Sequence, residues 1–95
     1  MTQSVEFTAD GTLRVSAELA ADYFPAHALV ARVEANHLWL IPLAGPQGGG
    51  LYLKQRNPRG DRSTLIWEAF AGEMPVGSRP VAWDAERGAL RVELT

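Results

Sequence analysis

The chain has 95 residues, of which 46% are hydrophobic and 21% charged, and a formal net charge of −2, so we expect one domain, residues 1–95, with a thin core. The absence of cysteine excludes disulfides, thiolate zinc sites, iron–sulfur clusters and cysteine nucleophiles, and it favours a reducing cytoplasm. There is no signal-peptide pattern at the start and no run of roughly 20 apolar residues, so we expect a cytoplasmic protein without membrane contact.

The first predicted element is a hairpin that pairs Val5–Phe7 with Thr12–Val15. A three-residue turn with Gly11 in the left-handed region places Glu6 opposite Arg14 and joins apolar residues to apolar residues. A two-residue turn is the alternative, and it would set charged side chains opposite apolar ones. We therefore expect the three-residue turn.

A short helix follows the first hairpin. Ser16 is a favourable N-cap, and Glu18 in the first turn suits the helix dipole. Pro25 disfavours a helical conformation at Phe24, so the helix is expected to end near Tyr23. A helix this short is not stable alone and has to pack on the sheet.

The second predicted hairpin pairs Leu29–Glu34 with His37–Ile41. Its turn is Ala35-Asn36, and Asn36 is expected to take the positive φ that a tight turn requires. In this register Arg32 lies opposite Trp39, and we expect its guanidinium to lie over the indole ring.

A glycine-rich loop, Leu43–Gly50, separates this hairpin from a third one within Leu51–Phe70. The loop lacks the Lys-Ser/Thr of a phosphate-binding loop and is interpreted as a connector. Asn57-Pro58-Arg59-Gly60 fits a type I turn. The resulting four-residue loop sets Arg56 opposite Asp61 and Leu51 opposite Ile66.

The last part of the chain contains an irregular stretch and a fourth hairpin. Ala71–Pro80 is rich in glycine and proline and is expected to be irregular. Val81–Trp83 and Ala89–Leu94 then pair across a five-residue turn. The alternation of apolar and charged residues predicts that the final strand has one solvent-exposed face.

The tip of the third hairpin holds the main charge feature of the chain. Between Lys54 and Arg62 stand four cations and one carboxylate, a net +3, so the remaining residues carry −5. This distribution predicts docking onto carboxylate or phosphate groups, and the alternative is a solvated tip whose charges prevent edge-to-edge aggregation. The candidate binding residues, including two aromatic stacking surfaces, are Lys54, Arg56, Arg59, Arg62, Tyr52 and Trp67.

The sequence contains no recognisable catalytic or metal-binding pattern. His27 and His37 match no zinc-ligand spacing, and no serine stands in a Gly-x-Ser-x-Gly motif. The carboxylates are scattered over turns and strands, without the pairing that acid–base catalysis needs. We therefore expect a non-enzymatic protein with no cofactor and no bound metal.

The order of elements from Thr12 to Pro42 is that of a known half-domain. A strand, Thr12–Val15, precedes a short amphipathic helix, Ala17–Phe24, and a tight strand pair, Leu29–Pro42. This order of residue classes resembles the swapped-hairpin transcription factors of the AbrB and MraZ type. The resemblance implies an intertwined homodimer and DNA binding through basic residues of the early strands, where this chain has Arg14 and Arg32.

These patterns predict a mainly-β fold of about eight short antiparallel strands in hairpins. The strands would form a small barrel or sandwich, and one short helix makes α+β the formal alternative. The sparse charge favours a homodimer. The expected function is that of a small bacterial-type interaction or accessory module that docks an acidic protein surface. The alternative is a dimeric, AbrB-like DNA-binding regulator, which makes nucleic acid the second candidate partner.

Overall fold

The computed structural model describes residues 3–45 and 50–94, which form nine antiparallel strands, one α-helix and one 3₁₀ helix. The strands make one hydrogen-bonded sheet in the order β5-β3-β4-β9-β8-β1-β2-β7-β6, curled into a nearly closed barrel. The mainly-β prediction is confirmed, with a barrel rather than a sandwich. The elements are β1 (Ser4–Phe7), β2 (Thr12–Val15), α1 (Ala17–Tyr23), β3 (Ala28–Glu34), β4 (His37–Pro42), β5 (Leu51–Tyr52), β6 (Lys54–Gln55), β7 (Arg62–Leu65), η1 (Trp67–Ala69), β8 (Gly77–Asp84) and β9 (Ala89–Glu93).

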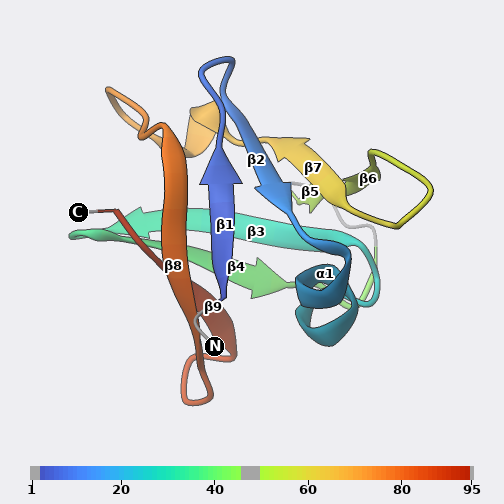
Figure 1. The fold of residues 1–95 in the computed structure, drawn as a ribbon. Coiled ribbons are helices and arrows are strands. Elements are labelled where there is room, and N and C mark those ends of the chain that lie inside the picture. The colour runs from blue at the N-terminus through green and yellow to red at the C-terminus, as the bar shows by residue number, and fades with distance from the viewer. Residues whose placement is uncertain (1–2, 46–49, 95) are drawn as a thin grey trace.

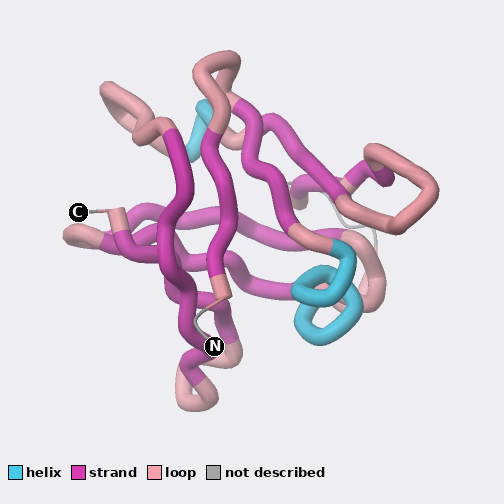
Figure 2. The backbone as a smooth tube through the Cα atoms, in the orientation of Figure 1, coloured by secondary structure: helices cyan, strands magenta, loops and turns pink. Residues whose placement is uncertain are grey.

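The hydrophobic core fills the inside of the barrel. In Figure 1, β1 and β8 cross in front of β3 and β4, β2 runs beside β1, and α1 lies at the end where β2 leads into β3. Figure 2 shows the same path, with α1 as the larger of the two helical segments. Alternate strand residues point inward, as in Val5 and Phe7 of β1 or Leu38 and Leu40 of β4, and all four are buried.

The first hairpin and the helix form as predicted. Glu6 lies opposite Arg14, and Gly11 has the expected positive φ of 87°. Any other residue at Gly11 would be strained, and its Cβ would lie 3.0 Å from that of Trp67. The Ser16 hydroxyl accepts the N–H of Leu19 at 3.2 Å, which confirms the N-cap.

The second hairpin has the predicted register, including Arg32 opposite Trp39. Its turn differs in one respect, because the positive φ of 54° belongs to Ala35 and not to Asn36. Asn36 instead uses its carbonyl oxygen to accept the N–H of Leu94 at 3.0 Å. The turn therefore places a residue with a Cβ in the left-handed region.

The third hairpin is shorter than predicted, because the chain changes partners at Leu53. On the tip side, β6 pairs with β7 in the expected register, and the Arg56 N–H donates to the Asp61 carbonyl at 2.7 Å. On the other side, β5 leaves the ribbon and pairs with β3, so Leu51 lies opposite Leu29 and not Ile66. This pairing covers part of an edge of β3 that a continuous ribbon would leave open.

Leu53 is the residue at which the two ends of the sheet meet. Its side chain is fully buried, and its N–H donates to the His27 carbonyl at 2.7 Å. Its own carbonyl accepts from Arg62 Nη1 at 2.7 Å. One residue thereby connects the β3 edge to the β7 edge and closes the barrel.

β8 is longer than predicted and begins at Gly77, within the stretch expected to be irregular. Its first half pairs with β1 and its second half with β9, the latter in the predicted fourth hairpin. Pro80 is tolerated because the bond from the Val81 N–H to the Gln3 carbonyl makes Ser4 and Pro80 a non-hydrogen-bonded pair. No donor is therefore needed from Pro80 toward β1.

Two further observations concern loops and helices. The connector predicted at Leu43–Gly50 lies largely outside the described residues, which stop at Gly45 and resume at Gly50. No helix among the described residues is long and apolar enough to cross a membrane.

Truncation of Leu53 should test its role in closing the barrel. We expect Leu53→Ala to lower the free energy of unfolding by about 2–5 kcal/mol, because a fully buried leucine leaves a cavity. The control is Leu65→Ala, at a leucine that is 60% exposed, which should change stability by less than about 0.5 kcal/mol. Equal effects in urea denaturation would contradict the assignment.

Candidate functional site

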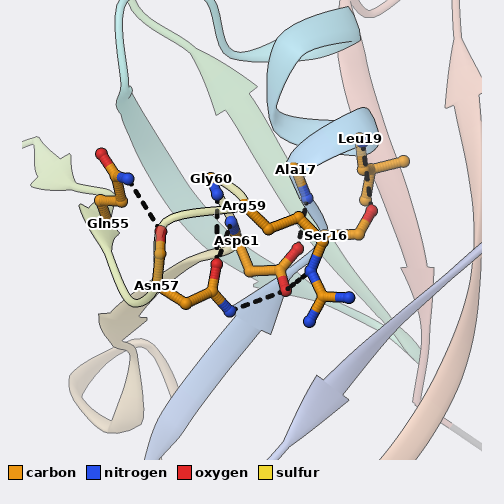
Figure 3. A network of polar contacts seen from close by, with 8 residues as sticks. All are labelled: Ser16, Ala17, Leu19, Gln55, Asn57, Arg59, Gly60 and Asp61. Atoms are coloured by element: carbon orange, nitrogen blue, oxygen red, sulfur yellow. Dashed lines mark hydrogen bonds and ion pairs between the residues drawn. The ribbon is translucent and has the colours of Figure 1, made fainter.

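The tip of the third hairpin is held in one conformation by its own polar groups. The Gly60 N–H donates to the Asn57 carbonyl at 3.1 Å, which closes the predicted turn, and Gly60 has a φ of 101°. The Asn57 side-chain oxygen also accepts the N–H groups of Gly60 and Asp61. The Gln55 amide donates to the Asn57 carbonyl at 2.8 Å (Figure 3).

Asp61 fixes this tip to the start of α1 (Figure 3). One carboxylate oxygen accepts the backbone N–H of Ala17 at 2.9 Å. The other accepts from the Asn57 amide at 2.9 Å and lies 3.2 Å from Arg59 Nε. A carboxylate at a helix N-terminus is favourable, since it satisfies a backbone donor left free by the helix.

The environment of Asp61 favours its charged form. Hydrogen bonds from the Asn57 side chain and then from the Ala17 backbone lower the pKa of this carboxyl below its ordinary value, and the nearby Arg59 guanidinium lowers it further. Asp61 is therefore a carboxylate at neutral pH. Its carboxylate anchors the hairpin tip to the start of α1, and we call this role the fastener of the tip.

The four predicted cations fall into two groups. Lys54 and Arg56 are exposed, and neither forms an ion pair with another described residue. Arg59 pairs with Asp61, yet its side chain remains 76% exposed. Arg62 is half-buried and is occupied with the Leu53 carbonyl, so it supports the barrel closure and is not presented at the tip.

The structure separates the two predicted aromatic surfaces. Tyr52 is 56% exposed and precedes Lys54 by two residues, with the buried Leu53 between them in the chain. Trp67 is also 56% exposed but belongs to η1, at the opposite end of β7 from Arg62, where it packs beside Gly11. Trp67 therefore does not join the cations of the tip.

A second polar cluster, of which the sequence indicated only the pairing of Arg32 with Trp39, surrounds Trp39 on the outer face of the sheet. Arg32 of β3 and Arg91 of β9 lie opposite Trp39 on its two sides. The residue that lies over the indole is Arg87 of the β8–β9 turn, whose guanidinium carbon is 4.1 Å from the ring centroid. The prediction that Arg32 covers the ring is therefore wrong.

Arg87 is held over Trp39 by Glu34, whose carboxylate lies 3.1 Å from Arg87 Nη1. Both side chains of this pair are about half exposed, which limits its strength to about 0–1 kcal/mol. The cation–π contact adds about 0.5–1 kcal/mol at an exposed position. The Arg87–Glu34 pair is therefore a weak cover over a buried indole.

Sequence reasoning found the pairing of Arg32 with Trp39 but missed Arg91 and Arg87, because their place depends on the pairing of β4 with β9. The alternation of Leu90 and Val92 with Arg91 does place Arg91 on an outer face. The residues around Arg91 do not indicate that it shares an outer face with Arg32 and Trp39. The five-residue turn gives no sign of where Arg87 points.

Metal chemistry has no evident place among the described residues. Within residues 3–45 and 50–94, no three His, Asp or Glu side chains gather in a way that could hold a metal ion. His37 lies 2.8 Å from the Glu93 carboxylate, and His27 is part of the connection between α1 and β3. The two histidines thus belong to separate regions of the barrel.

Comparison with known proteins gives no assignment: no family model matches the chain, and no curated protein or solved structure is similar enough to count as a match.

The role of Asp61 as a fastener predicts a specific pH dependence. Because its pKa is lowered on folding, the Asp61 carboxylate stabilises the fold above its ordinary pKa of 3.8, and this contribution is lost as the pH falls through the lowered value. Asp61→Asn should therefore unfold at lower urea than wild type at neutral pH, and the two should converge in acid. The control is Asp22→Asn, at an exposed residue of α1, which should follow the wild type throughout. A difference in unfolding midpoint between Asp61→Asn and wild type that stays the same in acid would contradict this role.

Proposed function

We propose that the protein is a non-enzymatic interaction module that docks an acidic protein surface through the basic hairpin, Lys54–Arg62. The observation that carries the proposal is the exposure of Lys54 and Arg56 on a hairpin whose tip is fastened to α1 by Asp61. Three exposed cations, with Arg59 as the third, project from one element of a chain with a net charge of −2.

Fastening the tip reduces the loss of conformational entropy on binding. A free hairpin loop would have to be ordered by its partner, whereas the Asn57 and Asp61 hydrogen bonds already fix this one. The cations also attract an acidic partner at a distance and raise the association rate at low salt. Tyr52, two residues before Lys54 in the chain, adds an exposed ring.

The roles of the candidate residues differ in this proposal. Lys54, Arg56 and Arg59 contact the partner, and Tyr52 extends that surface. Arg62 holds the hairpin to the barrel through Leu53 and is a positioning residue. Trp67 lies outside the docking surface.

Both the resemblance to swapped-hairpin regulators and the homodimer stay predictions. The strand that would open such a half-domain, β2, pairs with β1 on one side and β7 on the other, within the same chain. The same exposed cations would attract DNA phosphates, so duplex DNA is the alternative ligand. Steep loss of affinity with rising salt is expected for DNA, with a slope set by the number of phosphate contacts.

The docking proposal is tested by neutralising the two exposed cations that carry no other role. The double variant Lys54→Gln with Arg56→Gln should bind an oligoglutamate peptide about tenfold more weakly than wild type in fluorescence anisotropy, since two charge pairs contribute on the order of 1–2 kcal/mol. The matched control, Arg14→Gln with Arg79→Gln, changes the net charge equally on β2 and β8 and should bind like wild type.

Two results would contradict the proposal. Equal weakening in both double variants would show that only net charge matters. Tight binding to a mixed-sequence DNA duplex, with oligoglutamate left unbound at the same low salt, would favour the DNA-binding regulator.

A further inference from the structure

The surroundings of Trp39 form a second site, made by residues other than those of the basic hairpin. Trp39 points away from the core, because its neighbours Leu38 and Leu40 point inward, yet it is only 7% exposed. The guanidinium of Arg87 lies over the ring, and Arg32 and Arg91 stand opposite Trp39 on the two flanking strands. A buried indole on the outside of the barrel is thus covered by one cation and flanked by two more.

Two buried donors in this cluster have no hydrogen-bond acceptor among the described residues. They are Nε1 of Trp39 and Nε of Arg91, which belong to residues directly opposite each other on β4 and β9. Both groups only donate, so neither can satisfy the other. Buried polar groups in proteins normally have hydrogen-bond partners. These two donors lack an acceptor within the part of the chain that the structure describes.

A cavity of about 290 Å³ is lined in part by Trp39, which carries one of these donors and stands opposite Arg91, which carries the other. The aliphatic side chains of Ile41 and Ala89 form its apolar part, and Arg32, Arg87 and Glu34 provide its charges. This volume is at the small end of the range for small-molecule sites. An apolar floor next to guanidinium groups suits a ligand with an apolar body and an anionic head.

We propose that this site binds a small organic anion, whose carboxylate or phosphate oxygens accept hydrogen bonds from Arg32, Arg91 and Trp39 while its apolar body covers Ile41 and Ala89. The ligand reaches the buried donors when Arg87 swings off the indole. The Arg87–Glu34 pair that holds it there is exposed and therefore weak. Once displaced, Arg87 exchanges the Glu34 carboxylate for that of the ligand.

Glu34 competes with the ligand in this arrangement. Its carboxylate occupies Arg87 in the unliganded protein, and His37 and Glu93 form their own pair farther along the same face. Removal of the Glu34 charge frees Arg87 without removing any donor. Glu34→Gln should therefore tighten binding, which a merely structural role of the pair would not predict.

The indole N–H resonance of Trp39 reports directly on the acceptor. It is assigned with Trp67→Phe and Trp83→Phe, which remove the signals of the two exposed tryptophans. Benzoate should shift the Trp39 resonance saturably. Benzamide, which has the same ring without the charge, should leave it in place, and inorganic phosphate, which lacks the apolar body, should bind more weakly than benzoate.

Variants then locate the site. Arg32→Gln, at an exposed residue, should weaken benzoate binding about tenfold, because a charge-assisted contact is lost. Arg14→Gln, on a strand separated from β4 by β9, β8 and β1, should bind like wild type.

Three results would overturn the proposal. These are an equal shift with benzamide, a shift that does not saturate, and benzoate binding that Arg32→Gln leaves unchanged. Phosphate binding as tight as that of benzoate would overturn the role of Ile41 and Ala89.

Discussion

The architecture depends on one crossing, at Leu53, where the chain passes from one edge of the sheet to the other. β5 precedes this residue and pairs with β3, whereas β6 follows it and pairs with β7. The side chain of Leu53 enters the core, its N–H bonds to His27, and its carbonyl bonds to Arg62. A short β-sheet protein has to protect its edges, and here the chain itself joins them.

The crossing also determines where the basic hairpin stands. Because β6 pairs with β7 directly after Leu53, and β7 pairs with β2 as far as Val15, the tip between β6 and β7 is brought beside the start of α1, where Asp61 accepts the Ala17 N–H. The carboxylate that reduces the positive charge of the tip is the same group that fixes its position. Lys54 and Arg56 are left exposed as a consequence.

The features that the sequence predicted are those determined by neighbouring residues. Gly11 and Ser16 specified the first turn and the helix start, since backbone conformation and capping are local. Asn57 likewise specified the hairpin tip. Both hairpin registers in the first half of the chain were recognisable from which residues could share a face.

What the sequence did not predict depends on pairing between distant segments. The switch at Leu53 requires knowing that β3 has an open edge, and the extension of β8 to Gly77 requires knowing that β1 needs no donor from Pro80. The candidate site changed for the same reason. Arg62 donates a hydrogen bond to the Leu53 carbonyl, and Trp67 lies beyond the end of β7 opposite Arg62.

Amide hydrogen exchange at Leu53 measures the barrel closure most directly. If the closure holds the fold together, the Leu53 amide opens only with global unfolding and is protected as strongly as the amides of β4, an interior strand paired on both sides. Exchange at a rate typical of exposed loops, with β4 still protected, would show that the two sheet edges separate in the folded protein. That result would contradict the account of both the barrel and the hairpin it positions.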